Sequence, residues 1–275
     1  MKFLNIAAYR FVALDDLPAL RERLRERALA RRLKGTILIA PEGINLFLAG
    51  EQARIEAFFA RLDHDPRLAG MPQQRSWSEE QPYNRMLVKI KREIIRMDRP
   101  DIRPADMPAA RLAPQALKAW LDEGRDFLLL DARNEFEVAL GTFSGARSAG
   151  LKAFTDFPKS AAALGEADKN RPVVTFCTGG IRCEKAAPLL SRMGFNEVYQ
   201  LGGGILGYFE ACGADHFAGE CFVFDKRVGL DPSLKETGTT QCHACKAVVT
   251  VAEQRSPEYV CGKSCPHCRK LARAA

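Results

Sequence analysis

Apolar and polar residues alternate along the first hundred positions in an order typical of short strands and amphipathic helices. The run at 5–14 predicts an opening strand, and apolar residues then recur at helical spacing at Leu17, Leu20, Leu24 and Ala28. Two short apolar runs, 36–40 and 44–50, are separated by Pro-Glu-Gly, which is typical of a hairpin. A second helix is expected around 55–62.

The last strand of this region is expected over 86–96, where apolar and charged residues alternate. Such alternation predicts one buried face and one wet face. The complete order, strand-helix-strand-strand-helix-strand, is that of a ferredoxin-like (acylphosphatase-like) domain. Both helices are expected on one face of its sheet, which leaves the face that carries Lys89 and Lys91 open.

A second region follows a proline-rich linker at 97–113. Its patterns predict helices over 114–123 and 183–193, and strands over 126–131, 171–176 and 197–201. Strands that alternate with helices indicate a parallel sheet wrapped by helices, with an active site at the carboxyl ends of the strands. Cys177 occupies that position, directly after the strand that ends at Phe176.

The chain beyond residue 226 has no long periodic run and is too short to bury a core of its own. The sequence therefore predicts three parts: an N-terminal ferredoxin-like domain over 1–100, an α/β domain with a parallel sheet over 106–225, and a small cysteine-rich segment over 226–275.

Composition excludes several classes of protein. The 275 residues are 47% hydrophobic and 27% charged, and no apolar run approaches the roughly 20 residues that a membrane helix needs. The N-terminus lacks a small-residue signal cleavage site. The nine cysteines are odd in number and five lie within the last 34 residues, which argues against a disulfide framework. We expect a cytoplasmic protein that does not contact membranes.

Charge is unevenly distributed along the chain. Basic residues exceed acidic ones by six over 1–105 and by five over 226–275, whereas acidic residues exceed basic ones by four between them. Basic flanks favour a polyanionic partner such as nucleic acid. The candidate RNA-binding residues are Lys89, Lys91, Arg21 and Arg25. A solvated helix face is an equally good interpretation of the basic residues between Arg21 and Lys34.

The sequence CTGGIR around Cys177 contains what a reactive thiolate requires. A cysteine becomes a nucleophile only when its negative charge is stabilised. Two glycines allow the loop to curl its backbone N–H groups around the sulfur, and the following helix directs its positive end at the same place. Arg182 adds a positive charge that stabilises the thiolate or a bound anion. The loop backbone that surrounds the sulfur is that of Thr178, Gly179, Gly180 and Ile181.

These residues resemble a known active site. FCTGGIRCEKAAPLLSRMGF is similar to the active-site loop and helix of rhodanese-type sulfurtransferases, and LLLDARNEFEVALGTFSGA is similar to their upstream signature, with Asp131, Arg133 and Glu137 in place. The resemblance implies that Cys177 carries a persulfide. This chain departs from it at Thr142, where a histidine is usual, and at Cys183, where many members have serine. Cys183 is therefore a candidate second thiol.

The wider pattern is similar to the rhodanese-domain tRNA uridine hydroxylases. It consists of a ferredoxin-like domain with APEGIN, a rhodanese domain with CTGGIRCEKA, the string FVFDKR and a cysteine-rich tail. The resemblance implies oxygen-dependent conversion of the wobble uridine (position 34) of tRNA to 5-hydroxyuridine, with molecular oxygen as co-substrate and the tRNA anticodon region as partner. No flavin, iron or haem motif is visible, and the electron donor stays open.

The glycine-rich string GGGILG at 202–207 satisfies a dinucleotide-binding pattern after a strand. No further strand-helix unit follows it to complete a nucleotide-binding half. Rhodanese domains carry a similar glycine turn at this place, so we do not expect NAD or FAD.

Two Cys-x-x-Cys pairs separated by 19 residues follow in the tail. This spacing predicts a structural zinc site with four thiolate ligands, Cys242, Cys245, Cys265 and Cys268. Redox-active cysteine pairs that feed Cys177 are the alternative. Cys261 is the spare thiol.

Three functions compete at this point. A tRNA uridine hydroxylase is favoured by the basic flanks. A sulfurtransferase that passes persulfide sulfur from Cys177 to an acceptor would need the same loop. A non-catalytic RNA-binding zinc protein would have no physical need for a thiolate cradle. The oligomeric state and the tRNA species recognised are not predicted.

Overall fold

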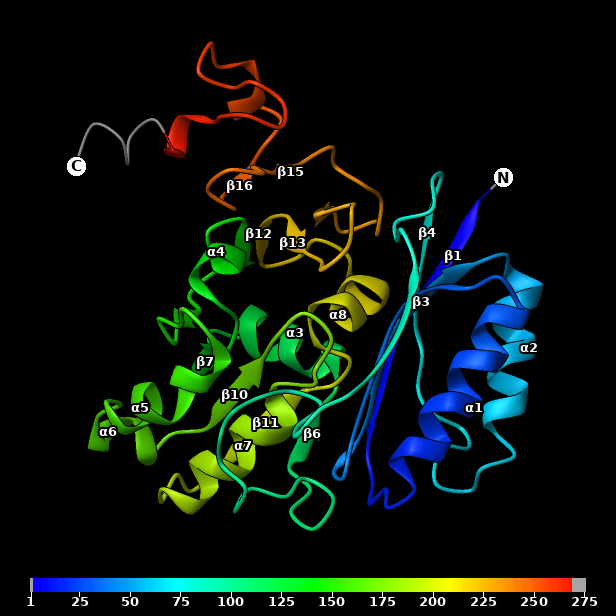
Figure 1. Cartoon of the computed structure of the whole chain (residues 1–275). Helices are drawn as coiled ribbons and strands as arrows, with labels where there is room; N and C mark the ends of the chain where they lie inside the picture. The colour runs from blue at the N-terminus through cyan, green and yellow to red at the C-terminus, as the bar shows by residue number, and fades with distance from the viewer. Residues whose placement is uncertain (1, 269–275) are drawn as a thin grey trace.

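The computed structural model describes residues 2–268 and is shown in Figure 1. The N-terminal domain has one five-stranded sheet with two helices on one face. Its elements are β1 (Phe3–Phe11), α1 (Leu17–Ala30), β2 (Lys34–Ala40), β3 (Gly43–Gly50), α2 (Gln52–Leu62), β4 (Gln74–Ser78) and β5 (Met86–Ile90).

The strand order β4-β1-β3-β2-β5 corrects one sequence assignment. The first four strands form the antiparallel ferredoxin-like sheet, and the fourth of them is the polar segment Gln74–Ser78 rather than residues 86–96. β5 is an additional edge strand that pairs with β2 in parallel and ends at Ile90. The polar composition of β4 hid it, because only a hydrophobic period marks a strand in sequence.

The second domain contains a parallel sheet, as the sequence predicts, and the structure shows that it has five strands in the order β6-β11-β10-β7-β9. Its elements are β6 (Ala110–Leu112), α3 (Pro114–Asp122), β7 (Leu128–Asp131), α4 (Glu135–Val138), β8 (Gly141–Phe143), β9 (Arg147–Ser148), the 3-10 turn η1 (Phe154–Asp156), α5 (Phe157–Ala162), α6 (Glu166–Lys169), β10 (Val173–Phe176), α7 (Cys183–Arg192), β11 (Val198–Leu201), α8 (Gly204–Cys212) and β12 (Phe217–Gly219).

Successive residues of the central strands face opposite cores, as a sheet covered on both sides requires. Val173 packs with α5 and α7, whereas Val174 packs with α3 and α8. The predicted linker contributes to this domain: Met97 and Ile102 are buried in the first of these cores. Its last residues form β6 at the edge of the sheet.

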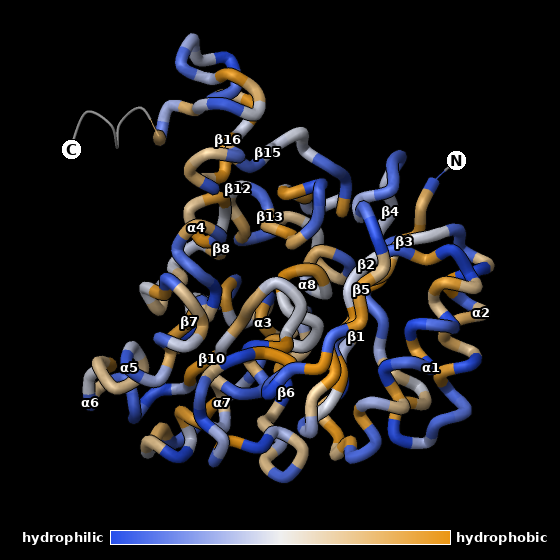
Figure 2. The backbone as a smooth tube through the Cα atoms, in the orientation of Figure 1, coloured by the Kyte–Doolittle hydropathy of each residue, from blue (hydrophilic) through white to orange (hydrophobic). Residues whose placement is uncertain are grey.

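The remaining chain forms short hairpins beside the second domain: β13 (Cys221–Phe222), β14 (Gly229–Leu230), β15 (Thr240–Gln241), β16 (Val248–Val249) and the 3-10 turn η2 (Glu253–Arg255). Figure 1 shows α1 and α2 on the side of the first sheet that faces away from the second domain. Along both helices hydrophilic and hydrophobic positions alternate (Figure 2), as expected for helices with one exposed side. No helix among residues 2–268 is long and apolar enough to cross a membrane.

Candidate active site

Cys177 lies at the carboxyl end of β10 and is almost completely buried, with 1% of its surface exposed. The backbone N–H of Gly180 donates a hydrogen bond to its sulfur at 3.1 Å. Gly180 has a φ of +96°, and a side chain there would also approach the Tyr9 hydroxyl to 2.9 Å. The glycine is therefore required both for the curl of the loop and for the close approach of the N-terminal domain.

The surroundings of Cys177 favour the thiolate. Burial by itself raises the pKa of this thiol, but a hydrogen bond with Cys183, the charge of Arg182 and the backbone N–H groups of Arg182 and Gly180 together lower the pKa to about 6. A cysteine with this pKa is largely ionised near neutral pH, which is the state that reacts.

Cys183 is the first residue of α7 and is fully buried beside Cys177. Burial, together with the hydrogen bond to Cys177 and its charge, raises the pKa of Cys183 well above the usual range. The pKa values of the two thiols are thus shifted in opposite directions, lowered for Cys177 and raised for Cys183.

Arg182 is held in place by the buried carboxylate of Glu137. The sequence identified Glu137 only as part of the rhodanese signature, without a role. Its guanidinium donates two hydrogen bonds to Glu137, each 2.7 Å long, and Glu137 is 0% exposed. Glu137 also accepts a hydrogen bond from the backbone N–H of Asn134 at the start of α4. The paired geometry fixes the arginine beside the sulfur.

Asp131 and Arg133 form a second buried pair behind the loop. Arg133 donates to Asp131 at 2.7 Å and to the Gly141 carbonyl at 2.6 Å. Thr142, which replaces the usual histidine, donates to Asp131 at 2.8 Å. Thr142 therefore contributes to the buried hydrogen bonds behind the loop and not to the reactive surface.

The glycine-rich turn at 202–207 supports the Cys177 loop. The N–H groups of Ile205 and Leu206, in the first turn of α8, donate to the carbonyls of Cys177 and Thr178 at 3.0 and 3.1 Å. Gly204 has a φ of +62°, and a side chain there would lie 2.4 Å from the Cys177 carbonyl. The turn has a local structural role that accounts for its glycines without a dinucleotide.

The N-terminal sheet closes the site from the opposite side. Gln74 on β4 donates to the carbonyls of Gly179, at 3.3 Å, and Gly203. Tyr9 on β1 donates to Glu184 of α7 at 3.0 Å. The sheet face that the sequence predicted to be open is therefore one wall of a cleft of about 1000 Å³ whose other wall includes Cys177 and Arg182.

The strings CEKA and APEGIN join the two domains, which sequence reasoning did not foresee. Lys185, 1% exposed in its side chain, donates to Glu42 of APEGIN at 2.9 Å and to Glu93 at 2.6 Å. Its neighbour Glu184 accepts hydrogen bonds from Tyr9 and Arg111. Two adjacent residues of α7 thus fix the N-terminal wall against the helix that follows the reactive loop.

The predicted RNA-binding residues do not line the cleft. Lys89 and Lys91 are exposed on and just beyond the edge strand β5. Arg21 on α1 donates to the Val88 carbonyl of that strand at 3.2 Å, and Arg25 is exposed one turn further along. Lys89, Lys91 and Arg21 therefore lie at the free edge of β5, which is the opposite edge of the sheet from β4 and its contact with the reactive loop.

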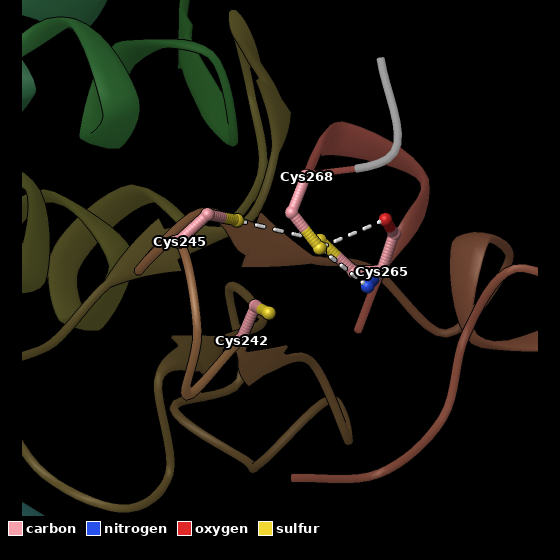
Figure 3. A group of neighbouring side chains, drawn as sticks. All are labelled: Cys242, Cys245, Cys265 and Cys268. Atoms are coloured by element: carbon pink, nitrogen blue, oxygen red, sulfur yellow. Dashed lines mark hydrogen bonds between the residues drawn. The ribbon is translucent and has the colours of Figure 1, made fainter. Parts of the chain in front are cut away.

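The tail brings its four predicted ligands together. The sulfur atoms of Cys242, Cys245, Cys265 and Cys268 all lie within 4.8 Å of one another. Figure 3 shows the four side chains turned toward a common space. The sulfur atoms of Cys245 and Cys265 are 3.5 Å apart. Four sulfurs around zinc at about 2.3 Å each are separated by about 3.8 Å, so this cluster could hold a metal ion. Cys261 is exposed and lies outside the cluster.

Known proteins are similar to this chain in sequence along its whole length. Proteins named tRNA uridine(34) hydroxylase are 53% identical in Cupriavidus necator, over 98% of this chain and 97% of theirs, and 50% identical in Ralstonia nicotianae, over the full length of both. The protein of the same name in Cupriavidus metallidurans is 51% identical over 100% of this chain and 99% of its own. The chain belongs to this family.

Two family models match this member of the tRNA uridine(34) hydroxylase family, one over each of its two sheet-containing domains. Residues 3–94 match the UPF0176 acylphosphatase-like domain, and residues 113–211 match the rhodanese-like domain. The predicted fold class is confirmed: an acylphosphatase-like domain, a rhodanese domain with a parallel sheet, and a terminal cysteine cluster.

Proposed function

We propose that this protein hydroxylates the wobble uridine, position 34, of tRNA to 5-hydroxyuridine, with molecular oxygen as co-substrate and Cys177 as the reactive group. The observation that carries the proposal is the geometry of the site: the Cys177 sulfur accepts a hydrogen bond from the Gly180 N–H and, with Arg182, lines a cleft of about 1000 Å³. Full-length relatives at 50–53% identity bear the name of this activity.

Each residue of the loop has a distinct role in the proposal. Cys177 provides the thiolate, and the backbone N–H of Gly180 holds its charge in place. Arg182, fixed by Glu137, stabilises the negative charge on the sulfur and on a group bound to it. Cys183 is the second thiol, and it acts as a hydrogen-bond donor. Gly179 leaves room for Gln74, whose Oε1 lies 2.7 Å from where a side chain would begin.

The cleft is suited to a nucleotide of the anticodon loop. Wobble bases are unpaired and can be turned outward, and enzymes that act on a base take it into a pocket. Arg96 and Arg111 line this cleft, with 74% and 62% of their side chains exposed. The free edge of β5, with Lys89, Lys91, Arg21 and Arg25, is the proposed contact for the tRNA backbone outside the cleft.

The tail is proposed to bind one structural zinc ion through its four clustered cysteines. Four thiolates with no open position are typical of structural zinc sites. Among the tail residues that the structure describes, up to Cys268, the buried core consists of Cys242, Val249 and Cys265, so burial contributes little to the stability of this part.

A sulfurtransferase is the second candidate, because the cradle of N–H groups around Cys177 also suits a persulfide. The two functions differ in what they consume. Inserting one oxygen atom of O₂ into a C–H bond reduces the other atom to water and requires two electrons and two protons, so hydroxylation needs a reductant. Sulfur transfer needs a sulfur donor such as thiosulfate.

The test is complementation of a bacterial strain whose tRNA lacks 5-hydroxyuridine derivatives. We expect the wild-type gene to restore these nucleosides, as measured by mass spectrometry of digested tRNA, and Cys177→Ser to restore none while folding normally. If Cys177→Ser restored the 5-hydroxyuridine derivatives, Cys177 would not be the reactive group. Thiosulfate-dependent sulfur transfer by the purified protein, without any restored nucleoside, would favour the sulfurtransferase.

A further inference from the structure

An exposed aromatic side chain lies in the cleft without an assigned purpose. Phe224 has 57% of its surface exposed and lines the same cavity as Cys177. A single exposed apolar side chain is common on protein surfaces, so what distinguishes Phe224 is its place in the cavity that Cys177 lines. Phe224 belongs to the string FVFDKR, in which Phe222, Val223 and Arg227 are buried. Burial accounts for those residues but not for Phe224.

The ring of Phe224 is supported from behind by other aromatic rings. Its centroid lies 5.0 Å from that of Phe222 and 6.5 Å from that of Phe136, both in edge-to-face geometry. Phe222 is buried and packs edge-to-face on Phe136 at 5.1 Å. Edge contacts of this kind fix a ring while leaving a face free for a further partner.

The segment after Phe224 is held rigidly. Asp225 accepts hydrogen bonds from the backbone N–H and side chain of Arg227 at 2.9 and 2.8 Å. Arg227 also donates to Ser76 of β4 at 2.7 Å, and Tyr83 donates to Asp225 at 3.4 Å. Buried contacts to the N-terminal domain therefore fix the ring's position before any ligand binds, which reduces the entropy cost of binding.

The same segment contacts the reactive loop. The hydroxyl of Thr178, the residue after Cys177, donates to the carbonyl of Phe222 at 3.4 Å. Phe224 is two residues further along the chain. Arg96 and Arg111 line the same cavity. They are paired with Asp98 and Glu184, and most of each arginine side chain is exposed. A flat apolar ring, cationic side chains and a thiolate thus line one cavity, which matches the base, phosphate and reacting carbon of a nucleotide.

We propose that Phe224 is the platform on which the uracil ring of the target nucleotide stacks when it enters the cleft. The inference rests on the proposed function, and Phe224 acts as a positioning residue for that reaction. Unpaired bases in RNA-binding proteins stack on aromatic side chains in this way. Stacking of the target base would hold it beside the Cys177 loop.

The experiment measures binding of two anticodon stem-loop RNAs by fluorescence anisotropy, one with uridine at position 34 and one abasic there. We expect Phe224→Leu and Phe224→Ala to raise Kd for the uridine RNA about tenfold, the size typical of one base–aromatic stack, and Phe224→Tyr to leave it within about twofold. On the abasic RNA all four proteins should bind equally, because the stacking partner is gone.

Trp77→Ala is the matched control. Trp77 is 45% exposed, but it pairs with Leu4, whose side chain packs under the helices, so it lies on the other face of the sheet. We expect no change in Kd for either RNA. Thermal unfolding of Phe224→Leu, which keeps an apolar side chain against Phe222, controls for folding.

Two results would overturn the proposal: wild-type affinity of Phe224→Leu for the uridine RNA, or a loss that persists on the abasic RNA. The proposed function fails separately. In one outcome, wild-type protein forms no 5-hydroxyuridine on tRNA while Phe224→Leu and Phe224→Ala lose affinity for the uridine RNA alone. That result would support stacking on Phe224 and contradict hydroxylation. If hydroxylation occurs and that loss of affinity is absent, only the platform fails.

Discussion

The protein contains two groups of cysteines that are organised in opposite ways. Cys177 and Cys183 are both buried, and buried ion pairs behind the loop hold their surroundings. In the described part of the tail, two of the clustered cysteines, Cys242 and Cys265, are buried together with Val249. In Figure 1 the tail stands away from the two sheets.

The first group of cysteines is arranged for reactivity, whereas the second is arranged to stabilise a short segment. Around Cys177 the fold places a cation and N–H donors so that one sulfur carries charge and its neighbour does not. In the tail four sulfurs face one another with little apolar packing around them, so a bound ion would have to supply the stability. Cysteine spacing predicts the second arrangement directly, whereas the first depends on residues distant in sequence.

Metal removal should have the largest effect, and it should be confined to the tail. We expect about one zinc ion per chain by elemental analysis, none in Cys265→Ser, and proteolytic cleavage after residue 226 once a strong chelator is added. Zinc binding stabilises comparable short segments by roughly 10–16 kcal/mol. Cys261→Ser, which changes the exposed spare thiol, should retain the metal. A tail that resists proteases without metal would favour the redox interpretation.

Removing the carboxylate behind Arg182 should destabilise the rhodanese domain. Glu137→Gln leaves a buried guanidinium without its counter-charge, which typically costs about 3–5 kcal/mol. Urea unfolding measures this change. Glu135→Gln, at an exposed position on the same helix, should stay within about 0.5 kcal/mol of wild type. Equal stability of both variants would show that the buried pair does not hold the site.

The rate at which Cys177 is alkylated should depend on pH in a way that reflects its pairing with Cys183. Alkylation by iodoacetamide should rise with pH through about 6, the pKa of Cys177, and Cys183→Ala should move this midpoint upward because a hydrogen-bond donor to the thiolate is lost. Cys183→Ser keeps a donor and should move it less. A midpoint near the usual pKa of cysteine in wild-type protein would contradict the thiolate.

The same group links stability to pH. The pKa of Cys177 is lower in the folded state than in the unfolded chain, so between about pH 6 and the ordinary cysteine pKa of about 8.5 the unfolded state binds more protons. Stability should therefore rise with pH across this window, and the contribution should disappear as pH falls through about 6. Cys177→Ser should flatten this slope.

The smallest effect should come from the free edge of β5. Lys89→Gln together with Lys91→Gln should weaken tRNA binding and reduce its salt dependence by up to about one unit of slope per lost phosphate contact. The alkylation profile of Cys177 should not change. Lys159→Gln, at an exposed position on α5, is the control. Unaltered binding by the double variant would place the tRNA elsewhere.

Sequence patterns predicted much of this architecture, and the failures have identifiable causes. The strand that leads to Cys177 was predicted because it is a short apolar run, and the helix at Cys183 because its apolar residues recur at helical spacing. β4 was missed because QRSWS is polar. The burial of the open sheet face was missed because it arises from contacts between residues far apart in sequence, such as Tyr9 with Glu184 and Lys185 with Glu42. Periodicity carries no information about such pairs.

The most direct measurement of the central claim uses isotopic oxygen. Purified protein, unmodified tRNA and a reductant are incubated under oxygen-18 gas, and the nucleosides are analysed by mass spectrometry. We predict that wild-type protein forms 5-hydroxyuridine at position 34 that contains oxygen-18, and that Cys177→Ser forms none. Unlabelled 5-hydroxyuridine, or equal product from Cys177→Ser, would contradict a hydroxylation that uses molecular oxygen at the Cys177 thiolate.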